Sequence, residues 1–170
     1  MVCEKILGKI DDAEFLGSPV DYIDFEWHET YSKLHRKSSR GGRDIAVRLD
    51  DSVLKNGIKP GDVLGVDDDG TVIVADVLQT EILGFKVGEP FFFCAAKIAY
   101  EIGNCHAPLF AGRRGELITT YTEPMERLLN GFAKTFGLGA AVERRTEKLD
   151  FSKQLSSIVG HSHHHEHHEH

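Results

Sequence analysis

Residues 80–103 read TEILGFKVGEPFFFCAAKIAYEIG and mark the point where the chain changes from strands to helices. The first eight residues predict a short strand. Pro90 then stands where a helix would begin, because proline fits the first helical turn. Residues 90–103 are apolar over most of a helix circumference, and they end at Gly103 as a glycine-capped helix would. A strand followed by such a helix predicts a fold that contains both kinds of element.

The residues that follow continue this alternation and complete a motif. Residues 107–122 (APLFAGRRGELITTYT) predict two strands around a glycine-rich turn. Thr122 then has the character of a helix N-cap, and residues 123–137 carry an apolar stripe at helical spacing. Residues 140–149 (AAVERRTEKL) predict a last strand. The order βαββαβ over residues 77–149 is that of a ferredoxin-like domain.

The preceding part of the chain predicts strands. In residues 21–29 (DYIDFEWHE), apolar side chains alternate with polar ones, which is typical of a strand with one buried face. Residues 43–51 (RDIAVRLDD) repeat this period, and Asp69-Gly70 predicts the turn of a hairpin. No segment here has a convincing helical pattern. Residues 1–76 are therefore predicted to form a small β domain, and the fold class is α+β.

The C-terminal stretch 150–170 is polar and aperiodic, so we expect a mobile tail. Its last ten residues, HSHHHEHHEH, are broken by Ser162, Glu166 and Glu169, whereas engineered tags are usually uninterrupted, which favours a native segment. Neutral imidazole suits nickel, copper and zinc, and weak overlapping sites on a flexible chain exchange metal quickly. Such a segment is suited to capture and transfer of a metal, because catalysis needs a fixed open coordination position.

Composition excludes several classes of function. A formal charge of -7 argues against binding to nucleic acid, which needs a basic surface. The apolar stretches are shorter than the ~20 residues of a membrane-spanning helix, and the N-terminus lacks the pattern of a signal peptide. Three cysteines without a CxxC pair imply no disulfide framework, which fits a reducing cytoplasm.

Catalytic and nucleotide-binding motifs are also missing from the sequence. Residues 137–142 (GLGAAV) follow a helix and lack the third glycine of a dinucleotide fingerprint. No GxxxxGK[ST] loop is present, and the acidic spacing in residues 66–71 (VDDDGT) does not match a calcium loop. Cys105 and His106 are adjacent, which rarely lets the two side chains face one another as a nucleophile and its base. The folded part also lacks HExxH, so we do not expect an enzyme.

His106 is the second candidate metal ligand. It lies between the predicted helix end at Gly103 and Pro108, so by itself it is typical of a turn or helix-capping histidine. One histidine cannot hold a transition metal firmly. Two copies across a two-fold axis would supply two ligands at one site, because an isologous interface brings a residue to its own copy. The sequence alone leaves both interpretations open.

The chain resembles the urease accessory metallochaperones of the UreE family. The resemblance spans the whole chain and is carried by DIAVRL (44–49), GDVL (61–64), KIAYEIGNCHAPL (97–109) and the histidine-rich end. It implies a cytoplasmic homodimer that carries Ni(II) as cargo for the urease active site, working with the urease accessory GTPase and the urease apoprotein complex. It also implies that the β domain contacts partners or peptides and that His106 binds metal at the dimer interface. The tail ligands it implies are His161, His163, His164, His165, His167, His168 and His170.

One departure from the family affects the choice of metal. Cys105 stands where the family usually has arginine, so a repulsive cation is lost and a thiolate could act as an additional ligand. The alternative is a small cysteine that is buried and merely packs. Zn(II) or Cu(II) could therefore take the place of nickel. Cys94 is expected in the core, and His28 and His35 on the surface. A different function also stays open, in which the protein is an interaction module and metal binding by the tail is storage or incidental.

Overall fold

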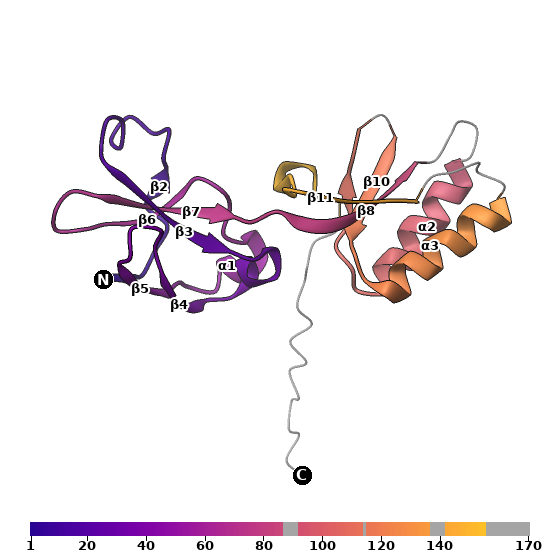
Figure 1. Cartoon of the computed structure of the whole chain (residues 1–170), viewed down its shortest axis with the longest axis horizontal. Helices are drawn as coiled ribbons and strands as arrows, with labels where there is room; N and C mark the ends of the chain where they lie inside the picture. The colour runs from indigo at the N-terminus through magenta and orange to yellow at the C-terminus, as the bar shows by residue number, and fades with distance from the viewer. Residues whose placement is uncertain (87–91, 114, 137–141, 156–170) are drawn as a thin grey trace, which may run out of the picture.

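The computed structural model of this chain describes residues 1–86, 92–113, 115–136 and 142–155. It shows two domains in a row, joined where strand β7 (Val72–Val77) leads into strand β8 (Thr80–Lys86) (Figure 1). Both sheets and helices are present, and the helices are concentrated in the second domain. The predicted α+β class is confirmed.

The first domain consists of two small sheets that share one core. One sheet has the strand order β1-β5-β4, and the other has the order β2-β6-β7-β3. The inward side chains of both sheets meet in one cluster, in which Phe25, Ile45 and Ile73 are fully buried. Gly70 has a φ of +81° at the turn of the β6–β7 hairpin, as the sequence predicts. The remaining strands are β1 (Val2–Cys3), β2 (Gly8–Lys9), β3 (Val20–Phe25), β4 (Leu34–Ser38), β5 (Asp44–Arg48) and β6 (Asp62–Val66).

Two short helical segments in this domain differ from the sequence prediction. Strand β3 ends at Phe25, so Trp27 and His28 do not continue its alternation but lie in a 3-10 turn, η1 (Trp27–Tyr31). The side chain of Glu29 accepts a hydrogen bond of 2.7 Å from the Glu26 amide. This bond stabilises the first turn of η1, so the chain does not continue as a strand after Phe25. A single helical turn, α1 (Val53–Asn56), also interrupts the strands. Each is too short to give a helical period in the sequence.

The second domain has the predicted ferredoxin-like topology. Strands β8, β9 (Phe110–Ala111), β10 (Glu116–Thr120) and β11 (Val142–Glu147) form an antiparallel sheet in the order β11-β8-β10-β9. This order is the one that the βαββαβ motif produces. Helices α2 (Phe92–Asn104) and α3 (Glu123–Phe136) cover one face (Figure 1). Pro90, predicted at the start of α2, lies outside the described residues.

Helix α3 confirms its sequence signals in detail. The amide of Met125 donates a hydrogen bond of 3.2 Å to the Thr122 hydroxyl, so Thr122 caps the helix. The apolar stripe packs with the inner face of the sheet and with Ile98 and Ile102 of α2. Cys94 packs against the same core, as expected. The stripe residues are Met125, Leu128, Leu129, Phe132 and Phe136.

The opposite face of this sheet is partly covered by residues 148–155, which we call the strap. Residues 150–155, which the sequence assigned to the tail, are folded onto the domain, with a 3-10 turn η2 (Phe151–Lys153). Leu149 is buried in a cluster with Ile82, Phe110 and Ile118 of the sheet. Because only Leu149 and Phe151 carry this packing, the strap has no periodicity that would reveal it in the sequence.

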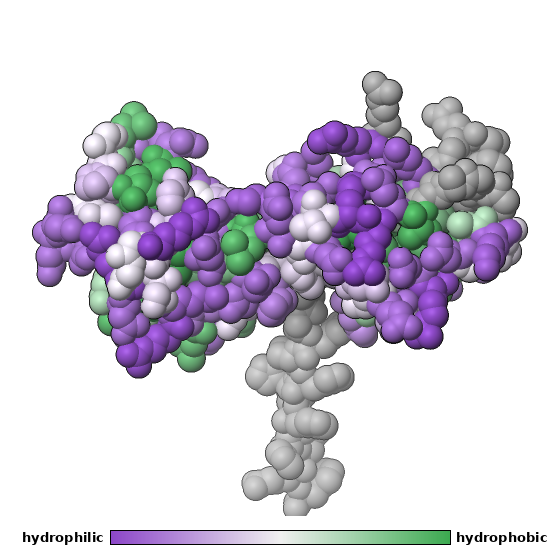
Figure 2. Space-filling model, in the orientation of Figure 1, coloured by the Kyte–Doolittle hydropathy of each residue, from purple (hydrophilic) through white to green (hydrophobic). Residues whose placement is uncertain are grey.

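The surface of both domains is mainly hydrophilic in the view of Figure 2, with small separate apolar patches. Within the described ranges, no helix combines the length and the apolar character that crossing a membrane requires.

Candidate metal centre

His106 lies at the C-terminal end of α2, in a backbone conformation that histidine seldom adopts. Its φ is +53°, in the left-handed region. The His106 amide donates a hydrogen bond to the Gly103 carbonyl (2.9 Å), and the Ala107 amide donates one to the Ile102 carbonyl (3.3 Å). This pattern is a Schellman motif in which His106 occupies the position where glycine is most common. Gly103, predicted as the cap, lies instead within the last turn of the helix.

The left-handed conformation has an energetic consequence. An L-residue other than glycine in this region costs about 1–2 kcal/mol relative to a right-handed helical conformation. The imidazole ring is exposed, and it has no hydrogen bond to any part of the chain that the structure describes. Within the described residues, the two backbone hydrogen bonds of the Schellman motif offset part of this cost and no hydrogen bond of the imidazole does; strain of this kind is concentrated at functional residues.

The three residues after His106 are held rigidly. Pro108 and Leu109 are buried, and the buried Thr119 hydroxyl donates a hydrogen bond of 2.7 Å to the Pro108 carbonyl. The Leu109 carbonyl accepts a hydrogen bond of 2.7 Å from the Leu155 amide at the end of the strap. The imidazole is thus attached to a fixed backbone. Leu155, which precedes the histidine-rich end in the sequence, is hydrogen-bonded to the chain three residues after His106.

One face of α2 carries exposed apolar side chains on both sides of Lys97. Phe93 is 85% exposed and Tyr100 is 66% exposed, and Ala96 lies between them on the same side of the helix. The spacing of three and four residues places these side chains in one stripe. Cys105, between the stripe and His106, is also exposed. The interpretation of Cys105 as a buried packing residue is therefore wrong, because the helix ends before the thiol can turn towards the core.

The other predicted ligands are not gathered around His106 by the described residues. The histidines of residues 161–170 lie outside the described residues. Among those that are described, no three His, Cys, Asp or Glu side chains lie close enough together to hold a metal ion. His28 is exposed, as expected. His35 is only partly exposed: it packs edge-on against Phe25 and its Nε2 lies 2.9 Å from the Ser32 carbonyl oxygen.

A buried ion pair, which the sequence analysis missed, lies on the strap side of the sheet. The Arg145 guanidinium donates to both Glu116 carboxylate oxygens, at 2.8 and 3.1 Å, and also to Glu147. Burial alone would raise the pKa of Glu116, but the hydrogen bond from Arg145 holds it below its usual range. A Cβ at Gly84, on the central strand, would collide with both side chains. This glycine is the signal in the sequence that something approaches the strand closely.

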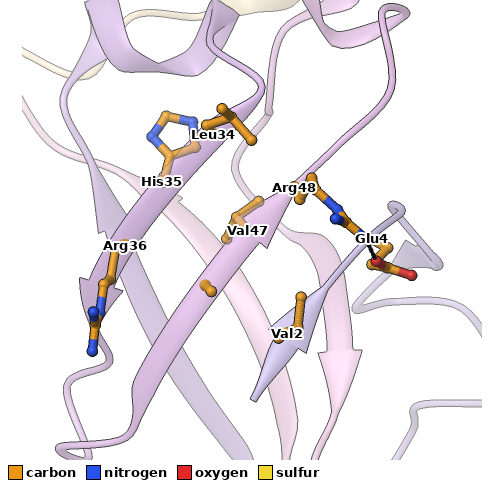
Figure 3. Close-up of a pocket in the computed structure, with 8 residues that line it drawn as sticks. Val2, Glu4, Leu34, His35, Arg36, Val47 and Arg48 are labelled. Carbon is orange, nitrogen blue, oxygen red and sulfur yellow. Dashed lines mark hydrogen bonds and ion pairs between the residues drawn. The ribbon is translucent and has the colours of Figure 1, made fainter.

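A shallow groove of about 800 Å³ lies on the outer face of the sheet β1-β5-β4 (Figure 3). Apolar Val2, Leu34 and Ala46 line it between two arginines, Arg36 and Arg48. Each arginine is paired with an exposed carboxylate, Arg48 with Glu4 in Figure 3 and Arg36 with Asp44 at 2.8 Å. Among the described residues that line it, no group of side chains is suited to hold a metal ion.

A fixed, exposed imidazole on a ferredoxin-like domain and a histidine-rich end offer nitrogen atoms of the kind that suit a transition metal. The chain belongs to the family of the UreE urease accessory proteins. The model of the UreE N-terminal domain matches residues 3–77, and that of the UreE C-terminal domain matches residues 85–170. This family has a role in urease maturation.

Curated relatives support the same membership over nearly the whole chain. The urease accessory protein UreE of Helicobacter pylori (strain G27) is 35% identical over 166 residues, which are 95% of this chain and 90% of the relative. That of Helicobacter acinonychis (strain Sheeba) is 34% identical with the same coverage. That of Helicobacter hepaticus (strain ATCC 51449 / 3B1) is 32% identical over 92% of this chain and 88% of the relative. The resemblance inferred from the sequence is confirmed.

Proposed function

We propose that this protein is a metallochaperone that captures Ni(II) and delivers it for assembly of the urease active site. The observation that carries the proposal is His106, an exposed imidazole without a hydrogen-bonding partner among the described residues, held in a strained conformation on a rigid backbone. Neutral imidazole is a suitable nickel ligand. Family membership supplies the context of urease maturation.

The protein acts as a homodimer in which two copies of His106 meet. The exposed apolar stripe of α2 supports this arrangement, because large apolar side chains on one helix face mark an interaction surface. The stripe runs along the helix that leads to His106, so an isologous contact centred on the C-terminal end of α2 would bring both imidazoles to the two-fold axis. Two ligands from rigid elements then bind the ion more firmly than one.

The tail histidines complete the coordination of the ion. Leu155 is hydrogen-bonded to Leu109, and hydrogen-bonded backbone segments lie about 5 Å apart. The three residues from Leu109 back to His106 add at most ~10 Å. From Leu155 to His161 there are six residues, which span up to ~20 Å when extended. His161 can therefore reach His106 of its own subunit. The further histidines of residues 163–170 add capacity and exchange sites for nickel entering or leaving.

Cys105 tunes the preference for the metal. Its thiol is exposed beside His106, where a thiolate would favour softer ions, so Zn(II) and Cu(II) compete with nickel at this site. Nickel is the cargo of the proposed function, and the urease accessory GTPase and the urease apoprotein complex are its proposed recipients.

Equilibrium dialysis against Ni(II) tests the proposal on the full chain, on His106→Ala and on a chain that ends at Gly160. The full chain should bind several ions per dimer. Truncation should leave a small residual number, and His106→Ala should remove the tightest site. If the His106→Ala dimer binds nickel as the unaltered dimer does, the proposed centre is wrong.

The groove of Figure 3 favours a second candidate function, that of an interaction module with incidental metal binding. The groove has an apolar floor between two exposed ion pairs, Arg36–Asp44 and Arg48–Glu4, whose charged groups could pair with a ligand instead. Such a surface fits an extended peptide of a partner protein. Affinity for the urease accessory proteins that is the same with nickel and with chelator would favour this function over the first.

A further inference from the structure

Strand β4 forms an open edge beside the groove of Figure 3. The sheet order is β1-β5-β4, so β4 has a hydrogen-bonded neighbour on one side only. It spans five residues, whereas β1, at the opposite edge, spans two. The backbone groups of an open edge are a template for a further strand. Of the two edges of this sheet, β4 is therefore the one long enough to accept one.

The pairing with β5 fixes which backbone groups of β4 face the open side. The Ser39 amide donates a hydrogen bond of 2.9 Å to the Arg43 carbonyl where the β4–β5 hairpin turns. Hydrogen-bonded positions alternate along an antiparallel pair, so Leu34 and Arg36 occupy the positions that are not bonded to β5. Their amides and carbonyls point outward, and they have no backbone hydrogen bond to any residue that the structure describes.

The same two residues direct their side chains to the face that carries the groove. Leu34 is 66% exposed and lies beside Ala46 of β5 (Figure 3). The Arg36 guanidinium pairs with Asp44, but both side chains are largely exposed, so the pair contributes little and another carboxylate can replace Asp44. The open edge thus offers an apolar position and a cationic position, two residues apart on one face.

A second copy of this chain is a poor occupant of the edge. Antiparallel pairing of β4 with its own copy, centred on the middle residue Arg36, would place two guanidinium groups directly opposite one another. Like charges in this position destabilise a pair of strands, whereas opposite charges stabilise it. The charge at Arg36 therefore disfavours self-pairing and favours an acidic strand.

We propose that β4 binds an extended segment of a partner protein by strand addition, with a carboxylate opposite Arg36 and an apolar side chain opposite Leu34. The segment runs antiparallel to β4, because residues that lie directly opposite then exchange both hydrogen bonds. These main-chain bonds supply affinity, and the alternate side chains in the groove supply specificity. The inference rests on the second candidate function, to which it adds the binding mode and the class of peptide. It is independent of His106, which lies on the other domain.

The probe is the capped peptide acetyl-Thr-Glu-Thr-Leu-Thr-amide, titrated into the full isotope-labelled chain and followed by NMR. Its glutamate faces Arg36, its leucine faces Leu34, and threonine favours an extended backbone. The amide signals of these two β4 residues should shift and saturate. Methyl groups on the amide nitrogens of the peptide's glutamate and leucine block both bonds to β4 and should weaken binding on the order of tenfold. A methyl group on the middle threonine, whose amide points away from β4, is the matched control and should change the affinity little.

The matching change in the protein is Arg36→Pro. Proline is tolerated on an edge strand where its nitrogen faces solvent, so this variant loses the outward amide hydrogen and keeps the β4–β5 bonds. Arg36→Ala keeps the amide and is the matched control. Arg36→Pro should bind the peptide about fivefold more weakly than Arg36→Ala. A peptide with lysine in place of glutamate should bind the unaltered chain more weakly than the acidic peptide, and the two should bind Arg36→Ala alike. Urea unfolding checks that Arg36→Pro is folded; the methylated peptides test the same bonds on the unaltered chain.

Each outcome separates strand addition from the function on which it rests. Equal binding of the differently methylated peptides would overturn strand addition and leave the groove as an interaction site. No shift in β4 at about 5 mM peptide would also overturn the inference, since strand addition with both side chains matched should reach millimolar affinity. The affinity for the urease accessory proteins with nickel and with chelator would still decide the interaction-module function. Self-association of the chain that Arg36→Pro abolishes would assign the edge to a second copy and overturn the inference.

Discussion

Replacing His106 with glycine should make the fold more stable while it destroys the metal site. At a φ of +53°, His106 bears the steric cost of an L-residue, about 1–2 kcal/mol. Glycine removes that cost, although its greater backbone freedom in the unfolded chain lowers the free energy of unfolding by about 0.4–1 kcal/mol. The net gain is of the order of 0.5–1 kcal/mol. With a urea m-value of about 2 kcal/mol per M, the unfolding midpoint should rise by roughly 0.4 M.

Urea unfolding at one protein concentration and in the presence of a chelator measures this gain, because bound metal or a change in dimerisation would otherwise shift the midpoint. His106→Ala should show no gain, since alanine keeps a side chain at the same left-handed position. Arg127→Gly is the matched control, because Arg127 is exposed in the interior of α3, away from the α2 stripe, and glycine there should lower stability by about 1 kcal/mol.

Nickel affinity completes the comparison. Both His106 variants should lose the tight site in the same dialysis experiment, whereas only the glycine variant should gain stability. A glycine variant with an unchanged or lower urea midpoint would refute the assignment of strain to His106. A glycine variant that keeps the tight site would refute its role as a ligand.

Three further predictions concern protons, the dimer and the buried ion pair. Nickel loading should fall steeply between pH 7.5 and 5.5 in dialysis, because a protonated imidazole cannot bind a metal and the side chain of histidine in model peptides takes up its proton near pH ~6.5; constant loading would contradict histidine ligation. Tyr100→Glu places a charge in the α2 stripe and should give a monomer without the tight site, by light scattering and dialysis; a nickel-binding dimer would argue against this interface. Arg145→Met should cost about 3 kcal/mol in urea unfolding at pH 7, since Glu116 stays buried without its partner. The pKa of Glu116 is lowered in the folded state, so the pair's stabilisation is present above the ordinary glutamate pKa of ~4.3 and is lost as pH falls below it; the variant should lack that loss.

The order of elements could be predicted because the signals are local. The cap at Thr122, the hairpin turn at Gly70 and the stripe of α3 each depend on residues within a few positions of one another, and the structure confirms all three. The predictions failed where an element is very short. The alternation through Trp27 could not reveal that a hydrogen bond from the Glu26 amide to the Glu29 side chain ends the strand.

For the candidate site, too, the residue types could be predicted from the sequence and their packing could not. The sequence makes the terminal histidines candidate donors, because neutral imidazole suits a transition metal, and the resemblance to the UreE family adds His106 to the candidates. It could not show that His106 is in a left-handed conformation, that Cys105 is exposed or that Tyr31 contacts the strap. Each of these depends on how the end of a helix or a distant segment packs.

The sequence by itself determined the class of fold and the presence of many imidazole side chains, since these follow from local periodicity and residue chemistry, and its resemblance to known proteins indicated the family. Only the tertiary structure decided which segments lie next to them. The hydrogen bond from the Leu155 amide to the Leu109 carbonyl joins positions 46 residues apart. Its formation depends on the competition among all long-range contacts of the folded chain, which no short window of sequence contains.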